Sequence, residues 1–258
     1  MPDTPMADSG HLRHDVRGRL VNSVVLMLAR RTHFLESEML GLGQVVGPGS
    51  VCVDVGAAAG LYTLALSRLV GPSGLVHSVE PLAIARPFWT RVLGAESGGN
   101  VRHHTVALGG EPGSGTMSVP VGRYGAVTGR SFLAGRSSGL GSNAEFRAHK
   151  NIDVPVETLD GLVERAGLPR VDFIKIDVEG AELHVLQGGE QVIEKFHPAV
   201  MAEIEARHLE RFEYGPQDLV QWLTSRGYRM HVWQDGWRPA ETVTTQFRNY
   251  LFRVPKAG

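Results

Sequence analysis

Short apolar runs alternate with amphipathic stretches along most of this chain, and glycines and prolines separate them. Apolar runs rich in β-branched residues predict buried strands, whereas apolar positions three and four apart predict helices. The predicted strands cover 51–53, 75–80, 101–108, 171–177, 199–205, 228–234 and 249–254. The predicted helices cover 34–46, 61–70, 83–94, 181–194 and 217–226. This alternation indicates an α/β fold with a single doubly wound, mostly parallel seven-stranded sheet, whose last two strands pair as a hairpin-like edge.

The N-terminal residues form a separate region ahead of this pattern. Residues 1–10 are polar and contain prolines, so we expect them to be loose. Between Leu20 and Leu28, apolar residues recur at helical spacing, which predicts an amphipathic helix packed on the domain. A helix lying on a membrane surface is the alternative. Gly47-Pro48-Gly49 interrupts regular secondary structure. We therefore expect a tail and helices over 1–47 and one domain over 48–258.

Composition narrows the functional classes. No stretch reaches the roughly 18 apolar residues of a membrane-spanning helix, and nothing resembles a secretory signal. The net charge of −1 argues against sequence-independent binding to nucleic acid. Cys52 is the single cysteine and lies in a predicted core strand, so no disulfide forms within the chain. We therefore expect a cytoplasmic protein, and we leave the oligomeric state open, a homodimer included.

The first predicted strand runs directly into a glycine turn and then a helix. The turn, residues 54–60, reads Asp-Val-Gly-Ala-Ala-Ala-Gly. Such a turn brings backbone N–H groups and a helix N-terminus close to a ligand. Twenty-six positions after Asp54, Glu80 ends the second strand, where an acid commonly grips a ribose diol. Together these features indicate a nucleoside cofactor, with an ordinary tight turn as the alternative.

The glycine spacing discriminates between cofactors. A dinucleotide site favours G-x-G-x-x-G, whose middle glycine makes room for a pyrophosphate. Ala58 stands at that place, which weighs against an NAD-linked oxidoreductase. The observed D-x-G-x-x-x-G pattern resembles the first motif of class I S-adenosylmethionine-dependent methyltransferases, which have a Rossmann-like fold. A catalytically silent cofactor-binding module is a further alternative.

Acidic residues end three of the predicted parallel strands. Asp54, Glu80 and Asp177 each follow or close an apolar run. Because ligands bind at the carboxyl ends of the strands in such sheets, we expect these acids to converge on one site.

The segment around Asp177 carries a closer resemblance. Residues 174–182 read Ile-Lys-Ile-Asp-Val-Glu-Gly-Ala-Glu, preceded by Thr158-Leu159-Asp160 and followed by Leu186-Gln187-Gly188. Together with the turn at 54–60, Glu80-Pro81, Ala107-Leu108-Gly109 and the closing Asn249-Tyr250-Leu251-Phe252, this block resembles the FkbM-type methyltransferases over about residues 34–254. One departure is Ala58, where the family more often carries asparagine.

The resemblance implies an S-adenosylmethionine-dependent O-methyltransferase acting on hydroxyls of sugars, glycolipids or polysaccharides, or polyketide-type metabolites. Asp54 would hold the cofactor's amino group, Glu80 both ribose hydroxyls, and Asp177 would face the methyl group. The remaining cofactor-binding positions implied are Gly56, Ala58, Gly60, Tyr62, Thr63, Pro81, Val106 and Ala107.

Methyl transfer to a hydroxyl needs a base within hydrogen-bond reach. The candidate catalytic residues are Asp177, Glu179, Glu205 and His208, and Glu203 is a further candidate base that needs a partner such as Lys175. Glu179 capping the next helix and His208 as a chance surface histidine are the alternatives. Asp177, Glu179, Glu205 and His208 also form an oxygen-rich set suited to Mg²⁺, although no spacing requires a metal.

Residues 111–153 contain many glycines and no confident core element, so we expect a mobile substrate loop there. A short strand near 116–121 is the one element expected inside it. Arg123, Arg136 and Arg147 would make it a basic cover for a glycan or anionic acceptor. A solvated insertion without a role is the alternative.

Overall fold

The computed structural model describes residues 36–82, 99–123, 125–127, 130–134 and 141–255. The predictions for residues 1–10, 20–28 and 83–94 and for Arg136 lie outside the described residues. In the described part, no helix combines the length and the apolar character that crossing a membrane requires.

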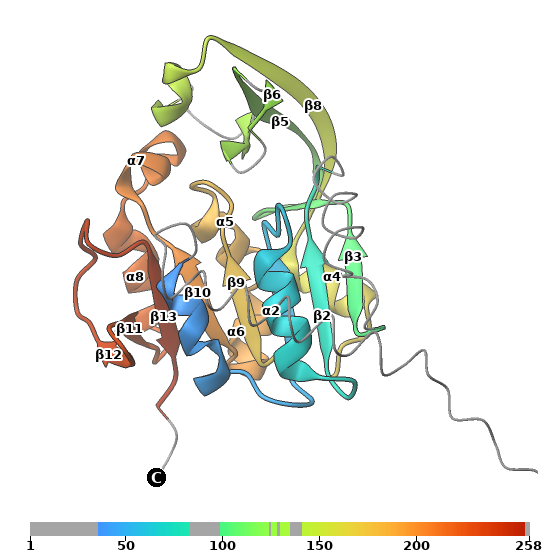
Figure 1. The fold of residues 1–258 in the computed structure, drawn as a ribbon, viewed down its shortest axis with the longest axis vertical. Helices are drawn as coiled ribbons and strands as arrows, with labels where there is room; N and C mark the ends of the chain where they lie inside the picture. The colour runs from blue at the N-terminus through green and yellow to red at the C-terminus, as the bar shows by residue number, and fades with distance from the viewer. Residues whose placement is uncertain (1–35, 83–98, 124, 128–129, 135–140, 256–258) are drawn as a thin grey trace, which may run out of the picture.

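A central eight-stranded sheet forms the body of the molecule, in the order β12-β11-β13-β10-β9-β1-β2-β3 (Figure 1). Five neighbouring strands are parallel: β10 (Ala199–Glu203), β9 (Phe173–Ile176), β1 (Val51–Val55), β2 (Leu75–Val79) and β3 (Val101–His104). Three antiparallel strands complete one edge: β13 (Asn249–Arg253), β11 (Arg229–Trp233) and β12 (Trp237–Pro239). The α/β class is confirmed, but the single seven-stranded sheet is corrected to a mixed sheet of eight strands plus a second sheet.

Helices cover both faces of the central sheet because its strands are apolar on both sides. On β1, Cys52 packs in one core cluster with η1 (Ser37–Gln44) and α2 (Leu61–Val70), whereas Val53 and Val55 belong to the cluster on the other face. That second face is covered by α4 (Leu159–Arg165), α5 (Glu182–Gln187), α6 (Glu190–Phe196) and α8 (Pro216–Thr224). The buried, unpaired thiol predicted for Cys52 is confirmed.

Two predicted elements are divided in the structure. The helix expected over 181–194 is divided into α5 and α6. Between these two helices the backbone passes very close to another segment of the chain. A Cβ on Gly188 would meet the Gly109 carbonyl oxygen at 2.1 Å. The strand expected over 101–108 ends at His104, and the next two residues to pair, β4 (Ala107–Leu108), join another sheet.

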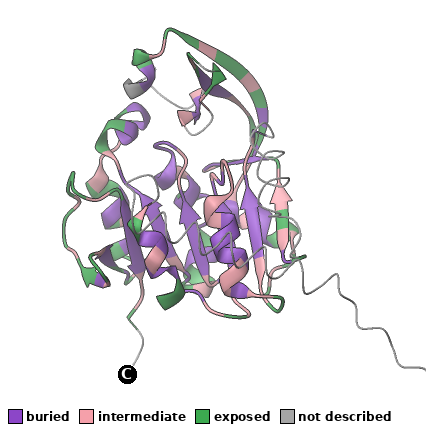
Figure 2. Cartoon of the chain, viewed as in Figure 1, coloured by how far each residue is buried: buried purple, intermediate pink, exposed green. Residues whose placement is uncertain are grey.

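Much of the described part of residues 111–153 lies in the strands of a second sheet. Its order is β4-β8-β5-β6, and β7 pairs with β5. The long antiparallel pair β5 (Gly113–Gly122) and β8 (Ala148–Glu157) is extended by β6 (Gly125–Ala126) and β7 (Phe132–Leu133). The inner face packs as a small apolar core of Leu82, Ala107, Met117, Val119, Leu133, Val154 and Val156. Much of the outer surface is exposed (Figure 2).

The second sheet stands over the end of the central sheet where the parallel strands finish (Figure 1). The short elements η4 (Gly141–Glu145), α7 (Ala206–Leu209) and η5 (Glu210–Phe212) lie on the same side, and α7 contacts η4. The second sheet and these short elements therefore cover the carboxyl ends of the parallel strands, where the sequence places its acids.

Candidate functional site

The turn after β1 is held against the tip of β2 by backbone hydrogen bonds. The amides of Gly56 and Ala57 donate to the Val79 carbonyl oxygen at 3.0 Å each. Gly56 has a φ of +78°, and a Cβ there would lie 1.8 Å from the Asp177 carbonyl oxygen. Only glycine fits this close approach of the β1 turn to the end of β9.

Glu80 connects this turn to the segment after β2. Its Oε2 accepts a hydrogen bond from the Ala58 amide at 2.9 Å, and its Oε1 accepts one from the Leu82 amide at 2.8 Å. Burial raises the pKa of Glu80, although both hydrogen bonds oppose that shift. The carboxylate is therefore fixed in position at the strand tip.

Ala58 has a left-handed backbone conformation with a φ of +43°. Residues that carry a Cβ adopt this conformation only at a cost in conformational free energy. We expect Ala58→Gly to raise the free energy of unfolding by about 0.5–1 kcal/mol, because glycine removes that cost. Ala59→Gly is the matched control: Ala59 lacks a positive φ, so its replacement should lower stability by a similar amount. Thermal unfolding of both variants checks the opposite signs, and equal shifts would contradict the prediction.

Asp54 lies at the bottom of the site. Its carboxylate accepts a hydrogen bond from Thr63 Oγ1 at 2.5 Å, and it is 1% exposed. Burial raises the pKa of Asp54 to about 6, even though Thr63 and Lys175 favour the charged form. Nearby, the Tyr62 hydroxyl donates to the Glu36 carboxylate. This end of the site thus carries several acidic groups.

Lys175 is a buried cation among these acids. Its Nζ donates to Asn249 Oδ1 at 2.9 Å and to Asp177 Oδ2 at 3.2 Å. Burial alone would lower the pKa of Lys175, but Asp177, Glu36 and Glu203 together raise it above its usual value. The expected partner of Lys175 was Glu203; its direct carboxylate partner is Asp177 instead.

Two cavities meet at the carboxyl ends of the central strands. The first, about 210 Å³, is lined by Val55, Gly56, Ala58, Val79, Glu80, Pro81, Val106, Ala107, Leu108, Met117, Ser131, Leu133, Asp177, Val178, Glu179 and Ala181. The second, about 170 Å³, is lined by Glu36, Met39, Asp54, Gly56, Ala57, Ala58, Ala59, Leu61, Tyr62, Lys175 and Asp177. Gly56, Ala58 and Asp177 border both, so Asp177 lies at the junction of the two cavities.

The sequence therefore predicts much of the lining. Asp54 and Asp177 line the second cavity, and Asp177 and Glu80 line the first together with Pro81, Val106 and Ala107. The lining residues of the second sheet, Met117, Ser131 and Leu133, were not predicted. No local pattern identifies them, because they reach the cavity only through the way the second sheet folds over it.

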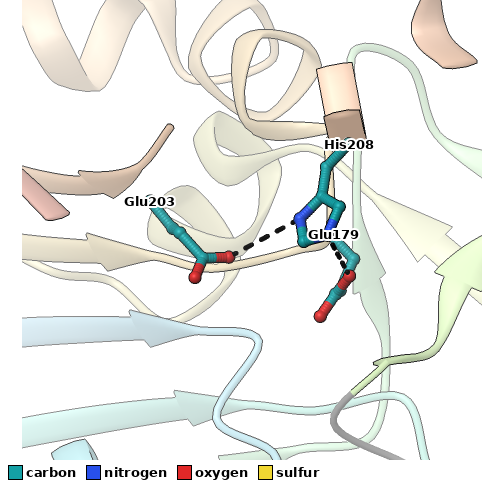
Figure 3. A group of neighbouring side chains, drawn as sticks. All are labelled: Glu179, Glu203 and His208. Carbon is teal, nitrogen blue, oxygen red and sulfur yellow. Dashed lines mark ion pairs between the residues drawn. The ribbon is translucent and has the colours of Figure 1, made fainter. Parts of the chain in front are cut away.

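Glu179, Glu203 and His208 form a buried cluster next to Asp177 (Figure 3). Glu179 follows β9, Glu203 ends β10, and His208 belongs to α7. The imidazole lies between the two carboxylates, with Nε2 3.4 Å from Glu179 Oε2 and Nδ1 3.9 Å from Glu203 Oε2. Of these three residues, only Glu179 borders the first cavity.

Burial dominates the electrostatics of this cluster. It raises the pKa of Glu179 to about 8 and that of Glu203 to about 10, with the nearby Asp177 charge adding to both shifts. It lowers the pKa of His208 to about 4, although Glu205 opposes that change. All three shifts favour the uncharged forms.

Glu205 and Glu179 have contacts other than those the sequence suggests. Glu205 is not a member of the cluster and forms ion pairs with Arg207 at 2.6 Å and Arg248 at 3.2 Å. Glu179 does not cap the following helix. Glu182 Oε1 instead accepts hydrogen bonds from the amides of Val178 and Gly180, at 3.0 and 3.1 Å.

The basic residues near the cavities also differ from those expected. Arg123 and Arg147 are exposed and line neither cavity. Arg130 pairs with Glu145 at 2.8 Å, and the Arg211 guanidinium lies 4.2 Å from the centroid of the Phe132 ring. Arg130 and Arg211 both lower the pKa of Glu179 against the effect of its burial, so their charges act on this residue of the site.

Residues 54–230 match the model of the methyltransferase FkbM domain. The chain belongs to this family. The match begins at Asp54 and includes Glu80, Asp177 and the cluster of Glu179, Glu203 and His208.

Individual relatives are distant. Methyltransferase 1 of Beauveria bassiana is 28% identical over 149 residues, which cover 54% of this chain and 58% of that protein. A methyltransferase FkbM from Methylobacillus flagellatus has a TM-score of 0.47 at 16% identity, covering 81% of this chain and 48% of its own. An S-adenosylmethionine-dependent O-methyltransferase from Thermotoga maritima has a TM-score of 0.46 at 14% identity, covering 90% and 71% respectively.

Proposed function

We propose that this FkbM-family protein transfers a methyl group from S-adenosylmethionine to a hydroxyl of a sugar, a glycolipid or polysaccharide, or a polyketide-type metabolite. The observation that carries the proposal is the position of Asp177 at the junction of two cavities. One cavity has the chemistry of a nucleoside site and the other that of an amino-acid site. The sulfonium of S-adenosylmethionine joins those two halves, so its methyl group belongs beside Asp177.

The nucleoside half would occupy the first cavity. There Glu80 is fixed at the strand tip, where it can accept hydrogen bonds from both ribose hydroxyls. Pro81, Val106 and Ala107 would pack against the adenine ring. The apolar Met117 and Leu133 of the second sheet would exclude water above it.

The amino-acid half would occupy the second cavity. Asp54 and Glu36 supply acidic groups for the cofactor's ammonium group, and the buried Lys175 supplies a positive charge near its carboxylate. Thr63 orients Asp54 through its hydrogen bond. Tyr62 closes the side of this cavity.

The acceptor would approach the methyl group from the side bordered by Asp177 and Glu179. The reaction is an in-line displacement: the acceptor oxygen forms a bond to the methyl carbon as the carbon–sulfur bond breaks. The electron pair of that bond stays on sulfur and gives S-adenosylhomocysteine. Alignment at about 3–3.5 Å supplies much of the rate. The hydroxyl proton passes to the Asp177 carboxylate, the nearest base to the methyl group in this arrangement.

Calorimetry with S-adenosylmethionine, S-adenosylhomocysteine and NAD tests the cofactor. We expect saturable binding of the first two and none of NAD, because Ala58 carries a Cβ where a pyrophosphate would need glycine. Tight NAD binding without S-adenosylmethionine binding would overturn the proposal.

Enzymatic methyl transfer is tested separately with radiolabelled S-adenosylmethionine and a panel of glycosides, glycolipids and polyketides. Label incorporated into an acceptor hydroxyl supports the proposal. Binding of S-adenosylmethionine without transfer to any hydroxylated acceptor would instead favour a silent cofactor-binding module.

A further inference from the structure

The cluster of Glu179, Glu203 and His208 contains polar atoms that lack the partners their burial requires. Glu179 Oε2 and His208 Nε2 are both inaccessible and form no hydrogen bond. The two side chains are 10% and 4% exposed. Leaving a buried polar atom without a partner costs about 1–3 kcal/mol, so native proteins rarely do so without a reason.

The two unpartnered atoms face one another. Glu179 Oε2 and His208 Nε2 are 3.4 Å apart, which is longer than a charge-assisted hydrogen bond of about 2.7–2.9 Å. A separation of 3.4 Å is instead typical of two ligand atoms that bind the same metal ion. With metal–ligand bonds of about 2.0–2.2 Å, a separation of this size corresponds to an angle of about 110° at the ion.

A third ligand is close by. Glu179, Glu203 and His208 each offer one ligand atom, and these three atoms lie within 4.8 Å of one another. One imidazole and two carboxylates form a mixed nitrogen and oxygen set. Such a set suits a divalent transition-metal ion better than Mg²⁺, which prefers oxygen ligands and retains several waters.

We propose that Glu179, Glu203 and His208 bind a divalent transition-metal ion beside the methyl-transfer site. This set differs from the one expected for Mg²⁺ in the sequence analysis. Glu205, which forms ion pairs with two arginines, and Asp177 are not members of this set, whereas Glu203 is. A positive ion would compensate the burial of the two carboxylates, whose pKa values are raised to about 8 and about 10.

The backbone holds the proposed ligands in place. Glu179 has a φ of +57°, a conformation that non-glycine residues keep only where surrounding structure enforces it. The next residue, Gly180, has a φ of +110°, and a Cβ there would lie 2.3 Å from the His208 carbonyl oxygen. The turn after β9 is thus pressed against α7, and this contact directs Glu179 toward the imidazole.

A second group of acids, Glu36, Asp177 and Glu203, also lies within ligand distance. It lacks the feature that points to a metal, because two of its members already have partners. Glu36 accepts a hydrogen bond from the Tyr62 hydroxyl, and Asp177 accepts one from Lys175. The cluster around His208 is therefore the site that the structure favours.

This inference rests on the proposed function for its catalytic consequence. Because Glu179 borders the first cavity beside Asp177, an ion bound to it would lie next to the incoming acceptor hydroxyl. A metal ion there lowers the pKa of a bound hydroxyl and orients it. Asp177 remains the group that receives the proton.

Mn²⁺ titration of the metal-free, full-length protein tests the site, with free Mn²⁺ followed by electron paramagnetic resonance. We expect one saturable site in the wild type and an affinity about 10–100-fold lower in Glu179→Gln and in His208→Gln. The control is Glu210→Gln, an exposed glutamate in η5 near His208 in the chain, which should bind like the wild type. Zn²⁺ added to the Mn²⁺-loaded wild type should displace the ion.

Circular dichroism before titration shows whether each variant is folded; if His208→Gln is not, Glu179→Gln carries the test. Equal Mn²⁺ affinity in the wild type and a folded Glu179→Gln would overturn the metal site. So would an absence of saturable binding in the wild type. Calorimetry with S-adenosylmethionine on the same samples separates the two proposals, because cofactor binding without Mn²⁺ binding removes only the metal site.

Discussion

Asp177→Asn is expected to lower kcat by about 10²–10⁴-fold, which is the contribution of a positioned general base. Asparagine has nearly the shape of aspartate and still accepts the hydrogen bond from Lys175, but it cannot take the acceptor's proton. The affinity for S-adenosylmethionine should therefore stay within a few-fold of the wild type. Initial rates with any acceptor that the wild type methylates, together with calorimetry, measure the two effects separately.

Asp172→Asn is the matched control for this variant. Asp172 precedes the opposite end of the same strand, where it accepts hydrogen bonds from Arg170 and from the Val51 amide. Its replacement should leave kcat unchanged even if it lowers the stability slightly. Wild-type kcat in Asp177→Asn would show that another group, with Glu179 the nearest candidate, receives the proton.

Glu80→Ala is expected to weaken S-adenosylmethionine binding by about 10²-fold or more. Two hydrogen bonds from the ribose to a carboxylate are each worth about 1.5–3 kcal/mol, and alanine removes both. The variant also releases the Ala58 and Leu82 amides, which hold the turn against the strand tip. Glu80→Gln retains an acceptor oxygen and should lose less affinity. Calorimetry on the three proteins measures the series.

Glu164→Ala provides the comparison, since Glu164 is an exposed residue of α4 that lines neither cavity of the site. We expect it to bind S-adenosylmethionine like the wild type. If Glu80→Ala bound the cofactor as tightly as Glu164→Ala does, the ribose would lie elsewhere, and the assignment of the first cavity to the nucleoside would be wrong.

The central sheet could be predicted from the sequence because its strands are buried on both faces. Mostly apolar stretches such as 171–177 and 199–205 favour strand over loop, and the helix expected over 61–70 has the bounds of α2. The paired edge formed by β11 and β13 also follows from its β-branched and aromatic residues.

Of the second sheet, only the short strand expected near 116–121 could be predicted, and it lies inside β5. The ten residues of β5 include three glycines and a proline, which resemble a loop in composition. The strand forms because β8 pairs with it along nine residue pairs, from Gly113 with Val156 to Val121 with Ala148. That pairing joins residues 27 to 43 positions apart in the chain and leaves no periodic signal within either strand.

The candidate site likewise contains some residues that could be predicted from the sequence and some that could not. Asp54, Glu80 and Asp177 could be predicted because each ends a recognisable strand, and parallel topology brings strand ends together. The pairing of Glu203 with His208, and of Glu205 with Arg207 and Arg248, depends on where α7 and Arg248 lie in the folded chain. Alternation along a strand does not fix which of two neighbouring acids meets a histidine beyond its end.

The join between the two sheets is short. Only residues 105 and 106 separate β3 from β4, so the chain passes from the central sheet to the second sheet through two residues. Val106 lies in this join and Ala107 begins β4, and both border the first cavity. Any hinge motion that moved the second sheet away to admit an acceptor would also move the cavity residues against which the adenine is proposed to pack. Entry of one substrate and retention of the other are therefore mechanically linked, which favours an ordered sequence with the cofactor seated first.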